Sequence, residues 1–219
     1  MTAPVCILGG TFDPIHFGHL RLAQELADVA GAGSVLFIPA GVPPHRAAPY
    51  AAAAQRLEMV RLAVAGNPRF AVDDRELKRG GPSYTIDTLA ALRDELGAAR
   101  PLCLLLGSDA FAALPTWHRW QALFDLAHIL VAHRPGAQHA AWDECMPPAL
   151  RVEYRKRLCS APAELRAAPA GRILAHAIAA LDISATAIRD GIRGGATPRY
   201  LLPDSVLDYI QANSVYAGG

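Results

Sequence analysis

The stretch VCILGGTFDPIHFGHL, residues 5–20, decides the fold, because an apolar run meets two glycines there and a helix follows. Residues 5–8 predict a buried strand, and residues 20–30 predict an Ala/Leu-rich helix with one polar face. The intervening loop joins the end of a strand to the start of a helix. Open α/β sheets bind their ligands at this position.

The alternation of strands and helices continues along the chain. Further strands are predicted at residues 34–38, 70–72, 102–106 and 128–132 and near Ile173, and helices at 51–65, 84–96, 147–158, around Thr186 and at 204–213, the last capped by Pro203-Asp204. Residues 102–106 are almost pure leucine, which is typical of a parallel strand covered on both faces. We expect an α/β fold with a doubly wound, Rossmann-like parallel sheet.

The predicted organisation is an α/β core over residues 1–182 and a small C-terminal helical subdomain over residues 183–219, within one structural unit. With 219 residues, 52% of them hydrophobic, the chain can bury a sheet between two layers of helices. The formal net charge of +1 provides no overall attraction to nucleic acid or to an anionic membrane. We predict neither as a partner, while an oligomer is possible.

The cysteines and the first residues bear on the compartment. Cys6, Cys103, Cys145 and Cys159 show neither CxxC spacing nor the density of a disulfide scaffold. The first ten residues lack the basic segment of a signal peptide, and no stretch approaches the roughly 20 apolar residues of a spanning helix. We predict a cytoplasmic protein with reduced thiols.

The loop after the first strand contains the most specific candidates for binding and catalysis. Gly9 and Gly10 allow close approach of the backbone to a ligand, and a helix N-terminus favours phosphate. His16 and His19, with Gly18 between them, can direct two imidazoles at one phosphate group. Two alternatives are a pair of histidines that cap the helix and a zinc site, although zinc needs further ligands that this loop does not obviously supply.

The loop is not the dinucleotide-binding fingerprint. It contains no GxGxxG, and the second strand ends in Pro39-Ala40 rather than in the acidic residue that would hold a ribose. These two features disfavour an NAD-dependent dehydrogenase.

Two motifs together resemble the signatures of the nucleotidylyltransferase superfamily. GTFDPIHFGH, residues 10–19, is similar to its HxGH signature, and ISATAIR, residues 183–189, is similar to its ISxTxIR signature. The resemblance implies that His16, His19 and Arg189 are catalytic. It also implies an ATP site formed by Gly9, Gly10, Thr11, Phe12, Gly18, Ile183, Ser184, Thr186 and Arg189. Taken alone, Ser184 and Thr186 are ordinary N-cap candidates and Arg189 an ordinary surface residue.

Three further segments resemble the nicotinate mononucleotide adenylyltransferase branch of that superfamily: PPHR at residues 43–46, PSYTIDTL at 82–89, and GSD at 107–109 followed by WHRW at 117–120. The resemblance implies that Trp117 stacks on the pyridine ring, with Trp120 a weaker candidate, and that Tyr84 and Thr85 lie on the side of its carboxylate.

Strand ends suggest the remaining binding residues. Gly107 and Asp109 follow the leucine strand, where Asp109 can reach a ribose hydroxyl of ATP or, alternatively, cap a helix over residues 110–113. His45 and Arg46 follow the second strand and are candidates for the acceptor phosphate. Arg134 follows the strand at 128–132 and is a further candidate, with a surface salt bridge as the alternative.

The implied reaction is adenylyl transfer from ATP to nicotinic acid mononucleotide, with Mg²⁺ bound alongside ATP and no metal ligands from side chains. The two signatures do not choose the acceptor by themselves. Nicotinamide mononucleotide, phosphopantetheine and a substrate for cytidylyl transfer remain alternatives. A non-catalytic nucleotide sensor is an alternative from another class of protein.

Overall fold

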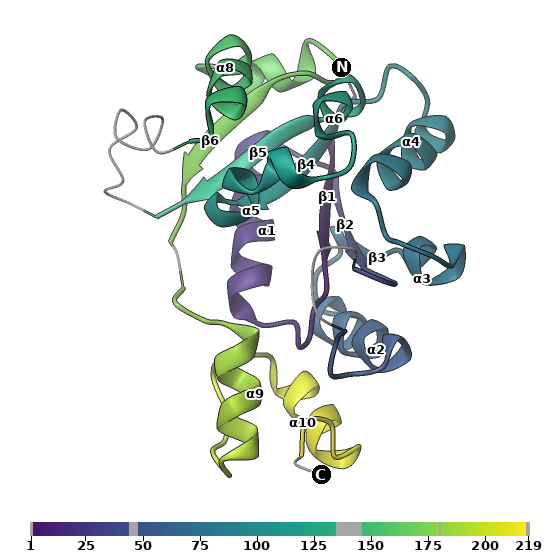
Figure 1. Cartoon of the computed structure of the whole chain (residues 1–219), viewed down its shortest axis with the longest axis vertical. Helices are drawn as coiled ribbons and strands as arrows, with labels where there is room; N and C mark the ends of the chain where they lie inside the picture. The colour runs from purple at the N-terminus through teal and green to yellow at the C-terminus, as the bar shows by residue number, and fades with distance from the viewer. Residues whose placement is uncertain (1, 44–47, 135–145, 180, 218–219) are drawn as a thin grey trace. The chain divides into compact units, whose positions relative to one another are not determined.

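The computed structural model describes residues 2–43, 48–134, 146–179 and 181–217 (Figure 1). Its centre is a six-stranded sheet in the order β3-β2-β1-β4-β5-β6. The strands are β1 (Val5–Gly10), β2 (Ser34–Pro39), β3 (Phe70–Val72), β4 (Leu102–Gly107), β5 (His128–His133) and β6 (Ile173–Ala177).

Helices connect the strands and cover both faces of the sheet. The α-helices are α1 (Phe17–Ala30), α2 (Ala53–Val64), α3 (Arg75–Arg79), α4 (Thr85–Leu96), α5 (Ser108–Ala112), α6 (Leu123–Leu126), α8 (Pro148–Arg157), α9 (Ala185–Arg193) and α10 (Asp204–Ala212). Short 3-10 helices occupy Leu114–Thr116, Trp120–Ala122 and Pro162–Arg166. Among the described residues, none of the helices combines the length and the apolar character that crossing a membrane requires.

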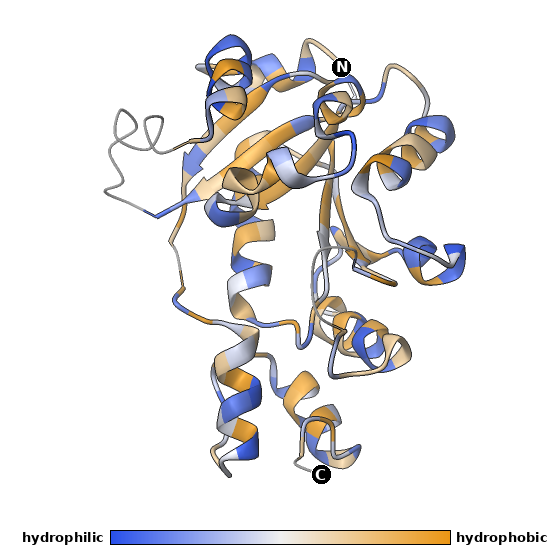
Figure 2. Cartoon of the chain, viewed as in Figure 1, coloured by the Kyte–Doolittle hydropathy of each residue, from blue (hydrophilic) through white to orange (hydrophobic). Residues whose placement is uncertain are grey.

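The pairing of β4 with its neighbours confirms the predicted doubly wound α/β fold. β4 pairs in parallel with β1 and with β5, and β5 pairs in parallel with β6. Figure 2 shows these central strands as largely hydrophobic, while the helices carry both polar and apolar residues. The five residues from Leu102 to Leu106 are all buried, each large one stabilising the fold by about 1.5–3 kcal/mol.

The chain divides into two compact units. The first comprises Met1–Leu8, Leu22–Val35 and Tyr84–Ala180, and the second comprises Gly9–Arg21, Leu36–Ser83 and Leu181–Gly219. Both motifs that resemble superfamily signatures lie in the second unit. The sequence-based division at residue 182 stays a prediction.

Local differences from the predicted elements have local causes. Helix α1 begins at Phe17, three residues earlier than predicted, because the carbonyl of His16 caps its first turn. The short helix α3 was not predicted, since five residues show no helical periodicity. The N-cap of α10 is Pro203 and its first residue is Asp204, as predicted, although no side chain caps the helix because proline has no polar side-chain atom.

Candidate active site

His16 and His19 are organised by the start of helix α1. The carbonyl of His16 accepts hydrogen bonds from the N–H groups of His19 (3.0 Å) and Leu20 (3.3 Å). In return, the N–H of His16 donates to Nδ1 of His19 at 3.3 Å. An acceptor nitrogen carries no proton, so this bond places the proton of a neutral His19 on Nε2. The side chain of His19 thus caps the start of the helix and keeps a defined donor at Nε2, whereas the imidazole of His16 is buried and its Nδ1 makes no capping bond among the described residues.

Burial determines the charge of His16. Its imidazole stacks on that of His19 with ring centroids 3.8 Å apart, and its Nδ1 has no hydrogen-bond partner in the described parts of the chain. This burial lowers the pKa of His16 from 6.5 to about 4. His16 is therefore neutral at pH 7, where it can bind phosphate through a hydrogen bond and not as a cation.

The loop between β1 and α1 is tightly built. Phe12 is buried in the left-handed region, with φ of 50°, and its ring packs edge-on against His19 at 5.2 Å. A Cβ atom added at Gly18 would lie 3.0 Å from the ring of His16, and one added at Gly10 would lie 3.0 Å from the ring of Phe12. Glycine at both positions lets the aromatic rings close on the backbone.

Helix α9 begins with the second motif. Ser184 is its N-cap and accepts a hydrogen bond from the N–H of Ala187 at 3.1 Å, so the N-cap interpretation of Ser184 is confirmed. Thr186 lies inside the first turn, and its Oγ1 accepts a hydrogen bond from Arg189 at 3.2 Å. The N–H groups of Ala185 and Thr186 have no hydrogen-bond partner among the described residues. A helix start with unpaired donors and a cation on the next turn suits an anion.

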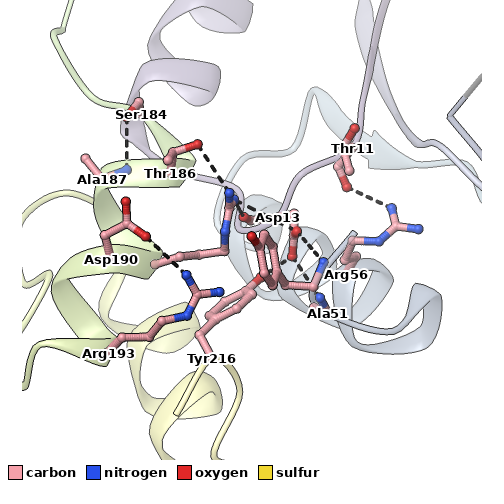
Figure 3. Close-up of polar contacts among 12 residues, drawn as sticks. Thr11, Asp13, Ala51, Arg56, Ser184, Thr186, Ala187, Asp190, Arg193 and Tyr216 are labelled. Carbon is pink, nitrogen blue, oxygen red and sulfur yellow. Dashed lines mark hydrogen bonds and ion pairs between the residues drawn. The ribbon is translucent and has the colours of Figure 1, made fainter. Parts of the chain in front are cut away.

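The two motifs meet through Arg189. Its Nη1 donates to the backbone carbonyl of Asp13 at 2.6 Å, across 176 residues of sequence, and lies 3.9 Å from the Asp13 carboxylate. The side chain of Arg189 is only 13% exposed, so its interpretation as an ordinary surface residue is wrong. Figure 3 shows α9 beside the loop that carries Asp13. Tertiary structure thus joins the histidines and the arginine in one unit.

Asp13 and Arg56 are structural residues of this site that the sequence prediction missed. The Asp13 carboxylate accepts hydrogen bonds from the N–H groups of Tyr50 (2.8 Å) and Ala51 (3.0 Å). Arg56 is 1% exposed and donates to the carbonyl of Thr11 at 2.7 Å (Figure 3). Burial lowers the pKa of Arg56, and the negative charge of Asp13 opposes that shift. The buried pair fixes the backbone of the loop from both sides.

A weak signal for Arg56 was present in the sequence. Within α2, Arg56 precedes Met59 and Val60 by three and four residues and therefore lies on the same helix face as these buried side chains. An arginine on an apolar stripe is unusual unless it is paired. The signal for Asp13 was its place inside the GTFDPIHFGH motif, although the motif did not indicate which residues Asp13 would contact.

The first unit brings together two of the segments assigned to the acceptor. Tyr84 is the N-cap residue of α4 and Thr85 its first residue. The ring of Tyr84 packs against that of His118 at a centroid distance of 4.5 Å, so the Tyr-Thr segment contacts the Trp117–Trp120 segment. Trp117 and Trp120 are both half-buried, and Trp120 packs edge-on against Phe124 at 6.2 Å. His118 had no assigned role from the sequence.

The ends of β4 and β5 position further candidates in the same unit. Gly107 is paired with Ala132, so Asp109 and Arg134 follow neighbouring strands at the same edge of the sheet. Asp109 is exposed in the first turn of α5, whose N-cap is Gly107, so the alternative in which Asp109 is the N-cap is wrong. Arg134 is also exposed. The predicted acceptor residues His45 and Arg46 lie outside the described residues.

A metal-binding cluster of three or more His, Cys, Asp or Glu side chains is absent from the described residues. The zinc alternative for His16 and His19 therefore has no support among them.

Comparison with known proteins defines the class first. The model of the cytidylyltransferase-like family matches residues 7–191, so the chain is a nucleotidyltransferase. Nucleotidyltransferases of this family generally use a divalent metal ion together with ATP. Two relatives share the name "Probable nicotinate-nucleotide adenylyltransferase". The protein from Dechloromonas aromatica is 52% identical over 99% of both chains, and that from Halorhodospira halophila is 52% identical over 91% of this chain and 89% of its own. This chain belongs to the nicotinate-nucleotide adenylyltransferase family.

Solved structures support the same fold at low sequence identity. The Plasmodium falciparum nicotinic acid mononucleotide adenylyltransferase complexed with NaAD aligns with a TM-score of 0.73 and 15% identity, covering 98% of this chain and 97% of its own. The same protein complexed with APC aligns with a TM-score of 0.71 and 15% identity over the same shares of both chains. At this identity the likeness shows the fold alone.

Proposed function

We propose that this chain transfers the adenylyl group of ATP to nicotinic acid mononucleotide and releases pyrophosphate. The observation that carries the chemistry is the 2.6 Å hydrogen bond from Arg189 to Asp13, which joins the two motifs in one unit. The names of the relatives and the Tyr84–His118 contact support nicotinate as the acceptor class. The product is nicotinic acid adenine dinucleotide, an intermediate in NAD biosynthesis.

The reaction is an in-line displacement at the α-phosphorus of ATP. An oxygen of the acceptor's 5′-phosphate forms the new P–O bond, and the bond from the α-phosphorus to the oxygen bridging to the β-phosphorus breaks. The nucleophile is already anionic, so no general base is needed. Catalysis then consists of positioning and of stabilising the charge that develops.

The geometry suggests a role for each group of the second unit. His19 donates from Nε2 to an oxygen of the α-phosphate. The hydrogen bond that its Nδ1 accepts from the N–H of His16 favours the tautomer with the proton on Nε2. Neutral His16 provides a hydrogen bond to phosphate. Ser184, Thr186 and Arg189 receive the departing pyrophosphate at the N-terminus of α9. Gly9 and Gly10 at the end of β1, with Thr11 next to them, allow the triphosphate to approach the backbone closely.

The roles of the first-unit residues remain proposals. Trp117 would stack on the pyridine ring, with Tyr84 and Thr85 on the side of its carboxylate. Asp109 and Gly107 would contact the ATP ribose and Arg134 the acceptor phosphate. His45 and Arg46 stay predictions for that phosphate.

We propose Mg²⁺ as the divalent ion. It would neutralise the triphosphate, and Mg²⁺ is commonly bound through substrate oxygens and water with few protein ligands. The described residues, which lack an acidic cluster, fit such binding. The cytoplasmic location also stays a proposal. It is supported by the free thiols of Cys6, Cys103 and Cys159, all of them buried.

The test is pyrophosphate release from ATP and Mg²⁺ with nicotinic acid mononucleotide, nicotinamide mononucleotide and phosphopantetheine offered separately. Strong preference for the first supports the full proposal, whereas preference for another acceptor would keep the chemistry and reject the acceptor. ATP binding without pyrophosphate release with any of the three would favour the nucleotide sensor.

The catalytic assignment has its own test in His19→Asn. The asparagine oxygen can still accept the N–H of His16 and preserve the helix cap, while the Nε2 donor is lost. We expect kcat to fall roughly a hundred- to a thousandfold, as on removal of an oxyanion-hole donor. A folded variant with kcat near that of the wild type would reject the role of His19.

A further inference from the structure

A tyrosine in the segment after α10 contacts the loop that carries the HxGH motif, residues 10–19. Tyr216 is 8% exposed, and its hydroxyl donates to Oδ1 of Asp13 at 2.7 Å across 203 residues of sequence. Figure 3 shows its ring beside the Asp13 loop. This contact lies within the second unit, and no pattern in the sequence singled it out.

The backbone adopts a costly conformation to place this hydroxyl. Ser214 and Tyr216 both lie in the left-handed region, with φ of 49° and 69°. Between them, the N–H of Val215 donates to the carbonyl of Ile210 at 2.9 Å and holds the turn against α10. Non-glycine residues with positive φ persist only where the surrounding structure compensates for them, and they are often found at functional sites.

Asp13 is the centre of the contacts that reach Arg189. One carboxylate oxygen accepts the Tyr216 hydroxyl and the N–H of Ala51, and the other accepts the N–H of Tyr50. Burial and the hydrogen bond to Asp13 both raise the pKa of Tyr216, so its hydroxyl keeps its proton and donates. The carboxylate therefore sits in a fixed orientation with three donors.

Two routes connect this carboxylate to the guanidinium of Arg189. The direct route is the 2.6 Å bond to the Asp13 carbonyl and the 3.9 Å ion pair with its carboxylate. The second runs through Tyr50, whose N–H is held by Asp13 and whose ring lies 4.5 Å from the guanidinium carbon of Arg189 and 4.4 Å from that of Arg193. A shift of Asp13 would move both supports of Arg189.

We propose that Tyr216 is a positioning residue for adenylyl transfer, which acts through Asp13 to hold Arg189 where the departing pyrophosphate forms. The inference rests on the proposed function, because it assigns Arg189 to that leaving group. The proposal gives Tyr216 no contact with either substrate, since its hydroxyl donates to Asp13. Its removal should lower kcat more than it changes the KM for ATP, since the contact with Arg189 matters most as charge develops on pyrophosphate.

The experiment compares Tyr216→Phe with the wild type in steady-state pyrophosphate release, well below the melting temperature of each. The phenyl ring keeps the packing and only the hydroxyl is lost. We expect kcat to fall about tenfold, the size associated with one hydrogen bond to a charged group. The control is Tyr209→Phe, because the Tyr209 hydroxyl on α10 makes no hydrogen bond among the described residues. Its kcat should equal that of the wild type.

A double-mutant cycle separates positioning from a loss of stability. In an Arg189→Ala background, Tyr216→Phe should lower kcat no further, because the residue through which it acts is gone. An equal loss in both backgrounds would overturn the proposal, as would an unchanged kcat in Tyr216→Phe while Arg189→Ala is impaired. Asp13→Asn removes the charge of the carboxylate and keeps its shape. It should also lower kcat in the wild-type background and not in the Arg189→Ala background, which is a second test of the same coupling.

Arg189→Ala by itself tests the proposed function independently of Tyr216. If Arg189→Ala alone turns over at the wild-type rate, the assignment of Arg189 to the pyrophosphate is wrong, whatever Tyr216→Phe does.

Discussion

Acidification should destabilise this protein in part through the buried side chain of His16; burial lowers the pKa of His128 as well, in the same direction. In the folded state the pKa of His16 is about 4, against 6.5 for an exposed imidazole, because the ring is buried against His19. As pH falls below 6.5, the unfolded chain takes up a proton at this position and the folded chain does not. The contribution of neutral His16 is thus fully present above pH 6.5 and is lost progressively as pH falls toward 4.

The magnitude follows from the two pKa values. Each pH unit between them costs about 1.4 kcal/mol, so the whole window corresponds to about 3 kcal/mol of the free energy of unfolding. Between pH 7 and pH 5 the expected loss from His16 is about 2 kcal/mol. This is a large share of the 5–15 kcal/mol that typically holds a folded protein together.

Urea unfolding of the wild type and of His16→Asn at pH 5, 6 and 7 measures this loss. Other titrating groups contribute to both proteins, so the difference between them isolates His16. The stability of the wild type should fall about 2 kcal/mol further than that of the variant between pH 7 and 5. His118→Asn, which changes an exposed imidazole, should track the wild type. A wild-type-minus-variant difference that stays constant with pH would refute the reasoning.

Three further substitutions test the packing around the site. Arg56→Met should lower the free energy of unfolding in urea by about 1–3 kcal/mol, because it leaves the carbonyls of Thr11 and Gly41 without their donor and removes a positive charge that interacts electrostatically with Asp13; a loss under about 0.5 kcal/mol would contradict this. Gly41→Ala places a Cβ 2.5 Å from a backbone oxygen of α3 and should lower the melting temperature, whereas Gly66→Ala, with open space around it, should not. Tyr50→Leu should lower kcat about threefold by removing the ring beneath Arg189, and Tyr50→Phe should leave kcat unchanged.

Much of the fold was predictable because its signals are local. The strands at residues 5–8 and 102–106 were recognised from apolar runs, and the observed strands β1 and β4 extend them by only one or two residues. The N-cap role of Ser184 was equally local, since its side chain bonds an N–H three residues ahead. A buried strand or a capped helix needs only its own neighbours to reveal it.

The resemblance to known motifs identified candidate site residues that hydrophobic periodicity alone could not. His16, His19 and Arg189 were identified from two short motifs, and the structure places all three in one unit. What the motifs did not contain was the electrostatic state of the residues. That His16 is neutral at pH 7 depends on its burial, which a sequence does not state.

The sequence by itself determined the order of the main strands and helices, the α/β class and the candidate residues for the chemistry, because each shows in a local pattern or in a motif. Only the tertiary structure decided that Tyr216 bonds to Asp13, that Asp13 holds Arg189 and that Arg56 is buried beside them. These contacts join residues up to 203 positions apart. Such a contact depends on how distant elements pack and on where burial leaves a charge in need of a partner, and both are properties of the folded chain as a whole.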